Sequence, residues 1–316
     1  MAAVTATTAK IDLTTKPGRH RADVAARWMF RLGAWTTFLV TVLIILTLVV
    51  DAWDFLSKLV DEPGGLGRLT DIGWFPRRGL YDIPTLVIGT LLITGIAMLV
   101  AVPLGLGVAV YLAEYAPPRM RRTVKPVVEL LAGIPSVVLG YFAIATINPE
   151  FVSRVFGSAD KAFTLMAAGI AVGILTIPIV ATVAEDALRA VPMALREASY
   201  GLGAQRLQST FRVVFPAAIS GIVAAVILGI SRAIGETMVV AIAAGAVGGG
   251  LRSWDPLHPG QTMTAAMAAL GFGSDQVAGD NLAFQSLYFI GLLLFFMTLL
   301  LNVFSDFLVR RVREVY

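Results

Sequence analysis

Six long apolar runs constrain this chain more than any other feature of its sequence. They lie near residues 29–50, 84–112, 125–147, 163–184, 213–247 and 282–309. Each is long enough to cross the hydrocarbon core of a bilayer, which takes about 20 residues as a helix. Only 15% of the residues are charged, against about 25% in soluble domains. We therefore predict an all-α polytopic membrane protein with six transmembrane helices.

Within the fourth run, Gly169 and Gly173 lie four residues apart. This spacing of small residues allows the backbone of a second helix to approach closely. Because the pattern is common in membrane helices, it permits a tight helix contact here but does not by itself predict one.

The charges between the runs predict the orientation of the chain. Basic residues gather in four segments, namely the tail up to Arg31, residues 114–125, residues 185–212 and residues 310–313. The alternate loops, 51–83 and 249–281, carry more acid than base. Short basic loops stay in the cytoplasm. Six spans place all four basic segments on one side, so we expect an inner or plasma membrane protein with cytoplasmic N- and C-termini.

The runs and loops divide the chain into four parts. These are a basic cytoplasmic tail (1–27), the first transmembrane helix with an extracytoplasmic loop (28–83), a transmembrane core (84–309) containing the loop 185–212, and a second cytoplasmic tail (310–316). The Gly/Pro-rich segments 51–83 and 248–262 are either solvated connectors or a docking surface for a soluble partner outside the membrane.

Several kinds of chemistry are excluded by residues that the sequence lacks. It has no cysteine and only two histidines, and no cluster of His, Asp and Glu has metal-ligand spacing. No G-x-x-x-x-G-K-[ST] segment is present to hold the phosphates of ATP. We therefore predict that the chain is not an enzyme, has no catalytic residues, and binds no metal or cofactor.

The loop 185–212 is longer than a connector needs to be. "VAEDALRAVP" and "MALREASYGLG" each read as a short helix, and the glycines that close the second are typical of a helix C-terminus. Two short helices beside the membrane suit a groove on a cytoplasmic partner.

This loop resembles the EAA motif of binding-protein-dependent ABC importers. The motif reads Glu-Ala-Ala, three residues, Gly, nine residues, Ile, one residue, Leu-Pro. Its pattern is matched by Glu197, Ala198, Gly203 and Pro216, whereas Ser199, Val213 and Phe215 depart from it. The resemblance implies a type I ABC importer permease (MetI-like) whose loop docks on a separate ATPase. Arg196 and Glu197 would make polar contacts there, and Gly203 would allow the turn.

A wider resemblance covers roughly residues 84–305. "GVAVYLAEYAPPRMRR", "VELLAGIPSVVLGYFA" and the stretch from the loop to "RAIGETM" are similar to phosphate-specific permease subunits, of the PstC type more than PstA. The resemblance implies a PstA-like second permease, two PstB-like ATPase subunits that carry ATP and Mg, and a PstS-like extracytoplasmic phosphate-binding protein. It implies no nucleic acid partner.

Two opposite charges, Arg232 and Glu236, lie inside the fifth apolar run. An ionisable residue at the centre of a span costs about 2.5–3.5 kcal/mol. On a continuous helix the two would share one face, but a base that precedes its acid is the weaker order for a local ion pair. We predict that Arg232 attracts phosphate along the translocation path, because guanidinium suits phosphate oxygens. A purely structural ion pair is the alternative.

Three other residues complete the predicted path. Glu236 would partly neutralise Arg232 when the site is empty, which keeps anion binding weak enough for release. Thr237 adds a hydroxyl beside the pair, and Ser136 in "GIPS" supplies another after a helix-interrupting proline.

Other functions remain open at this point. The EAA motif alone does not separate a phosphate permease from one for sulfate or molybdate. An ion-coupled secondary transporter or a channel would need no cytoplasmic docking loop, and the inverted repeats common in secondary transporters are not found. A membrane-embedded enzyme would need a nucleophile–base pair or a metal constellation.

Overall fold

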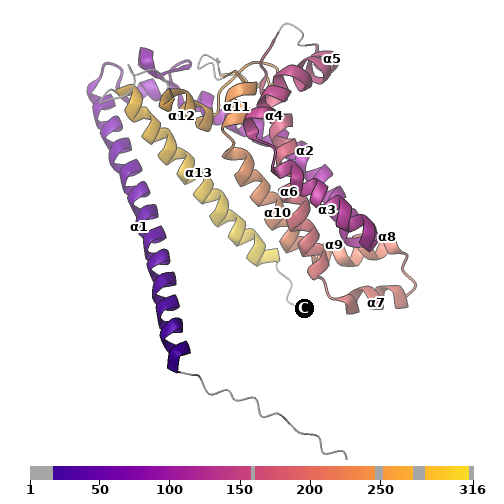
Figure 1. Ribbon diagram of the computed structural model, residues 1–316. Helices are drawn as coiled ribbons and strands as arrows, with labels where there is room; N and C mark the ends of the chain where they lie inside the picture. Colours follow the sequence, from indigo (N-terminus) through magenta and orange to yellow (C-terminus); the bar gives the residue numbers. More distant parts are fainter. Residues whose placement is uncertain (1–16, 158–160, 246–251, 273–281, 313–316) are drawn as a thin grey trace, which may run out of the picture. The chain divides into compact units, whose positions relative to one another are not determined.

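The computed structural model describes residues 17–157, 161–245, 252–272 and 282–312 (Figure 1). It separates into two units, residues 1–47 and 48–316. The first unit holds the beginning of the long helix α1 (Pro17–Asp61), and the second holds its end and all other elements. Of the predicted tails, residues 1–16 and 313–316 lie outside the described residues.

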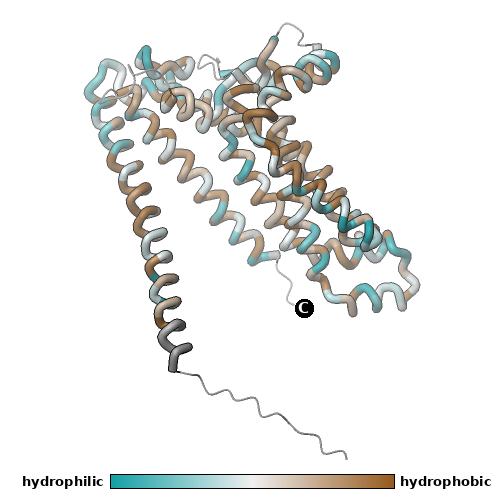
Figure 2. Tube along the Cα trace, in the orientation of Figure 1, coloured by the Kyte–Doolittle hydropathy of each residue, from teal (hydrophilic) through white to brown (hydrophobic). Residues whose placement is uncertain are grey.

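The second unit is almost entirely helical. Its longest helices after α1 are α2 (Ile83–Val110), α6 (Leu165–Ala190) and α13 (Leu282–Val312). Shorter helices are α3 (Pro118–Ala132), α4 (Ser136–Phe142), α5 (Ser153–Phe156), α7 (Met193–Gly201), α8 (Arg206–Ser209), α9 (Phe215–Ala217), α10 (Ile219–Ile234), α11 (Met238–Ala243) and α12 (Met263–Gly271). Apolar residues follow the long helices, and polar residues gather at helix ends and around α7 and α8 (Figure 2).

Helical turns of other types extend or connect these helices. Three are π-helical: η3 (Tyr111–Tyr115), η4 (Ala143–Val152) and η5 (Thr210–Val214). Two are 3-10 turns: η1 (Gly65–Thr70) and η2 (Pro76–Arg78). The strands β1 (Trp74–Phe75) and β2 (Leu80–Tyr81) pair antiparallel.

Five helices among the described residues are long and apolar enough to cross a membrane. They are Val24–Asp61, Ile83–Tyr115, Ser136–Phe156, Leu165–Ala190 and Leu282–Arg311. A bent pair, Arg206–Ala217 with Ile219–Ile234, raises the number to six if it counts as one span. The all-helical polytopic architecture is therefore confirmed.

The bounds predicted for the third span, residues 125–147, are wrong. α3 ends at Ala132, and a separate helical stretch begins at Ser136 and continues through η4 and α5. Pro135 explains the break, because proline lacks a backbone N–H and disfavours a helical conformation in the residue before it.

The fifth span is not the continuous helix predicted over residues 213–247. Its two parts meet at an angle of 72°, just after Pro216, and proline is a common cause of sharp kinks. α10 then ends at Ile234, and α11 begins only at Met238. Residues 246 and 247 lie outside the described part of the chain.

Two short helices are predicted in the loop 185–212, and the prediction of a separate helix over "VAEDALRAVP" is wrong. "VAEDALRA" has no helix breaker, so it continues α6 to Ala190. Pro192 disfavours helix at Val191, which is extended. The second predicted helix is confirmed as α7, which ends just before Gly203.

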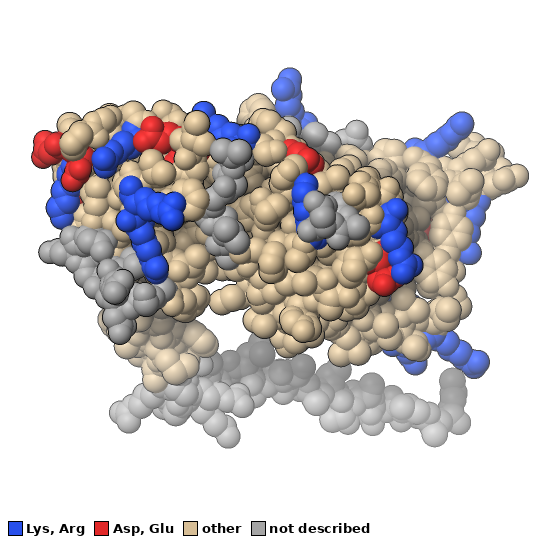
Figure 3. All heavy atoms as spheres, turned by 90° about the horizontal axis from the view of Figure 1, so that it is seen from above, with Lys and Arg blue, Asp and Glu red and all other residues tan. Residues whose placement is uncertain are grey.

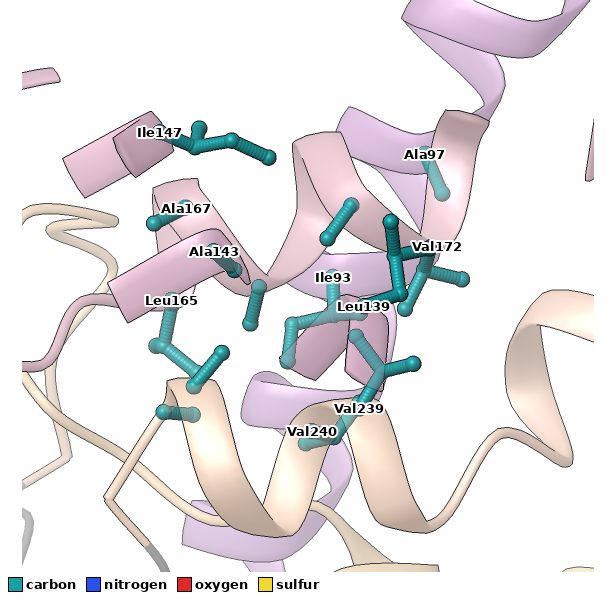
Figure 4. Packing of buried hydrophobic residues seen from close by; sticks show 14 of the residues in the cluster. Ile93, Ala97, Leu139, Ala143, Ile147, Leu165, Ala167, Val172, Val239 and Val240 are labelled. Carbon is teal, nitrogen blue, oxygen red and sulfur yellow. The ribbon is translucent and has the colours of Figure 1, made fainter. Parts of the chain in front are cut away.

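α2 and α6 pack so closely that side chains would not fit at several glycines. A Cβ atom on Gly173 would lie 2.8 Å from the Ala97 carbonyl oxygen, and one on Gly169 would lie 2.7 Å from Ile96 Cβ. The close approach that the small-residue spacing permits is therefore present at Gly169 and Gly173. The adjoining core joins α2 and α6 to α4, η4 and α11, with Ile93, Leu139 and Val239 close together (Figure 4).

At the opposite end of the second unit from α7, a buried carboxylate ties the β-hairpin to the helices. Asp82 is fully buried and accepts hydrogen bonds from Gly73 N, at 3.1 Å, and from Thr85 Oγ1. It also forms an ion pair with Arg252, Nη2 to Oδ1 at 3.1 Å. The face at this end carries both basic and acidic side chains (Figure 3). The segments on either side of the hairpin are thus anchored to α2.

Candidate functional site

Arg232 and Glu236 form an ion pair at a break between two helices. Arg232 lies in the last turn of α10, and Glu236 lies between α10 and α11. Arg232 Nη1 is 2.8 Å from Glu236 Oε2, and the side chains are 43% and 4% exposed respectively. The prediction that they share a continuous helix face is therefore wrong. The order rule for helical ion pairs does not apply, because the chain leaves the helix at Gly235.

Neighbouring elements hold Glu236 in place. Thr264 Oγ1, on α12, donates to the Glu236 carbonyl oxygen at 2.8 Å, and Val239 N donates to Oε1 at 3.5 Å. Thr237 Oγ1 donates to the Gly235 carbonyl oxygen at 3.3 Å. Glu236 is thus a fixed, buried carboxylate, whereas the partly exposed Arg232 guanidinium keeps donors for a second anion.

Ser136 lies at the start of α4, half-buried. α4 packs against α11, where a Cβ atom on Gly140 would lie 3.1 Å from Ile242 Cβ. Within the described part of the chain, no hydrogen bond joins Ser136 to Arg232 or Glu236. Ser136 therefore lies on a helix that packs against α11, the helix that follows Glu236.

The helix that carries the EAA motif, α7, is tied to the end of the second span. Arg196 Nη2 lies 3.0 Å from Glu114 Oε1 and donates to the Leu188 carbonyl oxygen at 2.8 Å. Arg206 donates to the Glu114 carbonyl oxygen, and its guanidinium lies 5.1 Å from the centre of the Tyr115 ring. The turn η3 therefore holds both α7 and α8.

The other motif residues are placed as follows. Glu197 and Ala198 are exposed on α7, and Pro216 lies in α9. Gly203 has φ +84, and its N–H donates to the Tyr200 carbonyl oxygen at 2.9 Å. The predicted turn at Gly203 is confirmed, since this φ favours glycine. Arg196 has an internal partner, and the docking contacts predicted for Arg196 and Glu197 stay a prediction.

A second buried carboxylate joins α3 to α6. Glu185 is fully buried, and its oxygens lie 2.6 Å from Arg121 Nη2 and 3.2 Å from Lys125 Nζ. Lys125 also lies 3.5 Å from Asp186 Oδ1. Burial alone would lower the pKa of Lys125, but the hydrogen bond and charge of Glu185 outweigh it and raise that pKa. Sequence reasoning missed this cluster, because Arg121 and Glu185 are 64 residues apart and no local pattern connects them.

The fold and these sites define the class of protein. It is a helical membrane bundle that carries an exposed helix, α7, tied to its core. Solved structures share this fold. An inward-facing MetNI methionine ABC transporter matches with TM-score 0.56 and 21% identity, over 74% of this chain and 100% of that one. A bacterial alginate ABC transporter in complex with its periplasmic protein matches with TM-score 0.64 and 14% identity, over 93% and 98%.

The chain belongs to the family described as binding-protein-dependent transport system inner membrane component, which matches residues 101–314. Phosphate transport system permease protein PstC 1 of Mycobacterium tuberculosis is 34% identical over 92% of this chain and 94% of that protein. The PstC permease of Pasteurella multocida is 29% identical over 95% and 96%.

Membership of this family establishes the general role of the chain. It is a multi-pass inner membrane permease component of an ABC importer, and it is not itself the ATPase. An importer of this kind also contains an ATPase and a binding protein. No cofactor is expected for such a permease.

Proposed function

We propose that this chain is the permease subunit through which an ABC importer takes up inorganic phosphate. The observation that carries the proposal is the 34% identity to a phosphate permease over 92% of the chain. The exposed guanidinium of Arg232, beside a helix break, agrees with an anion as the transported substrate.

Arg232 and Glu236 act together in the proposed path. Arg232 binds phosphate oxygens with charge-assisted hydrogen bonds. Glu236 lies 2.8 Å from the same guanidinium and competes with phosphate for it, so the anion is held only weakly and leaves again. Thr237 and Ser136 supply further hydroxyl donors.

The proposed assembly contains a PstA-like second permease, two PstB-like ATPases and a PstS-like binding protein. Residues 185–212 form the coupling loop within the core 84–309, and Glu197 on α7 contacts the ATPase. Residues 28–83 form the first transmembrane helix and an extracytoplasmic loop, and the loop 51–83, which includes the hairpin, faces the binding protein. The tails 1–27 and 310–316 lie in the cytoplasm, as does α7.

Reconstituted complex tests this function. We expect ATP-dependent uptake of labelled phosphate to exceed that of sulfate and molybdate. Arg232→Gln should lower phosphate uptake about tenfold or more, because a hydrogen bond to a charged group contributes about 1.5–3 kcal/mol. Arg154→Gln is the matched control, since Arg154 forms only an exposed ion pair with Glu150.

Two results would count against the proposal. Equal uptake of sulfate or molybdate would reject the substrate. Undiminished phosphate uptake by a fully assembled Arg232→Gln complex would remove Arg232 from the path. If Glu236→Gln lowers only the amount of protein, its role is structural.

A further inference from the structure

A cleft of about 800 Å³ lies between α3, α6 and α7, next to the end of α2. Its charged lining is mostly basic and comprises Arg121, Arg122, Lys125, Arg189 and Arg196. Glu129 is the acid among the lining residues. The cleft is separate from Arg232 and Glu236, which do not line it.

Not all of this positive charge is neutralised. Glu185 pairs with Arg121 and Lys125, and Glu114 pairs with Arg196. Arg122 and Arg189 are exposed, and neither has an ion pair within the described residues. The Nε atom of Arg196 is buried without a hydrogen-bond partner.

These three arginines lie on three different elements. Arg122 is on α3, Arg189 is at the end of α6, and Arg196 is on α7. Guanidinium groups bind phosphate oxygens with fixed, paired donors. An anion bound by all three would link α3, α6 and α7.

The size and the walls of the cleft indicate what carries the phosphate. Its volume of about 800 Å³ is far greater than one phosphate ion needs, and apolar side chains such as Leu112, Pro118 and Met193 line it. It lies at the end of the candidate span Ile83–Tyr115, where lipid headgroups meet water. Basic pockets between transmembrane helices bind anionic headgroups in this region.

We propose that this cleft binds the phosphate headgroup of an anionic phospholipid through Arg122, Arg189 and Arg196. The bound lipid braces α7 against α3 and α6. It thereby makes the position of α7 dependent on the composition of the membrane.

Native mass spectrometry of the full-length protein, purified from membranes containing phosphatidylglycerol, tests the proposal. The wild-type protein should keep phosphatidylglycerol during delipidation, and Arg122→Gln/Arg189→Gln should retain at least fivefold less. Arg310→Gln/Arg311→Gln is the matched control, because it removes two exposed arginines from the end of α13, outside the cleft. Arg122→Lys/Arg189→Lys should retain an intermediate amount, since lysine keeps the charge but not the paired donors.

Other results would overturn the proposal. If the wild-type protein, Arg122→Gln/Arg189→Gln and Arg310→Gln/Arg311→Gln all retain the same amount of lipid, the cleft holds no lipid. Free inorganic phosphate is the other anion that these arginines could bind. Equilibrium dialysis with labelled inorganic phosphate, without added lipid, distinguishes it from a lipid headgroup. If Arg122→Gln/Arg189→Gln loses phosphate binding but still retains lipid, the cleft binds free phosphate and the lipid proposal fails.

Discussion

Glu114 and Glu185 are buried carboxylates that connect segments far apart in the sequence. Glu114 receives Arg196 from α7, and Glu185 receives Arg121 and Lys125 from α3. A buried carboxylate is costly unless it is paired and hydrogen-bonded. Each therefore specifies where its basic partners must lie, and together they fix α3 and α7 against α6 and η3.

Removing the charge of Glu114 should loosen α7. In Glu114→Gln, Arg196 loses its ion partner while it remains only 12% exposed, which should cost about 3 kcal/mol. We expect a lower melting temperature in detergent and several-fold less ATPase recovered with the chain. Glu150→Gln breaks an exposed pair and should change stability by under about 1 kcal/mol. Equal melting temperatures for the two variants would contradict the anchoring role of Glu114.

At the scale of elements, the bundle depends on close backbone contact between α2 and α6. The contact forms at small residues because neither helix could approach over a larger side chain. Gly173 illustrates this, since the Ala97 carbonyl oxygen lies where its Cβ would need to be.

Gly173→Ala should destabilise the bundle by about 1–3 kcal/mol, because overpacking forces the backbones apart. Gly95→Ala is the matched control on α2, where a Cβ atom would meet nothing within 4 Å. Thermal unfolding in detergent compares the two. If Gly173→Ala is as stable as Gly95→Ala, the close contact does not limit the packing.

The exposed face of α7 is the surface that we expect to contact the ATPase. Glu197→Lys reverses an exposed charge that forms no ion pair within the described part of the chain. It should lower the amount of co-purified ATPase several-fold while the melting temperature stays unchanged. Glu150→Lys, an exposed acid on η4, serves as the control. Normal ATPase recovery with Glu197→Lys would exclude Glu197 from the docking contact.

At the scale of the whole molecule, the orientation in the membrane follows from the distribution of charge. The basic segments 185–212 and 114–125 both contribute to the cluster around α7. The loop 51–83, which contains the hairpin, carries in contrast more acid than base. Because lysine and arginine in short loops stay in the cytoplasm, α7 should face the cytoplasm and the hairpin should face the outside.

The absence of cysteine from the sequence makes this orientation directly measurable. A membrane-impermeant maleimide should label Ile72→Cys in cells with an intact inner membrane, whereas Leu202→Cys should react only after permeabilisation. Ile72 and Leu202 are 69% and 90% exposed, so both thiols are accessible within the chain. The reverse labelling pattern would invert the topology.

The apolar runs were sufficient to predict an all-helical membrane protein, and the spans formed by α2, α6 and α13 lie close to where the runs place them. The helix-forming run that ends in glycines likewise predicted α7, and the resemblance to the EAA motif predicted the turn at Gly203. These features are local, because a bilayer offers no water to satisfy the backbone and so requires a helix wherever about 20 apolar residues occur together.

The tertiary structure alone decided the rest. It paired Arg232 with Glu236 across the break between α10 and α11. It also placed Glu185 beside Arg121. Such contacts depend on which helix faces come together, and that choice rests on packing and charge pairing between distant residues. The sequence alone determined that this protein is a helical membrane permease, and the packed bundle decided which of its charges meet.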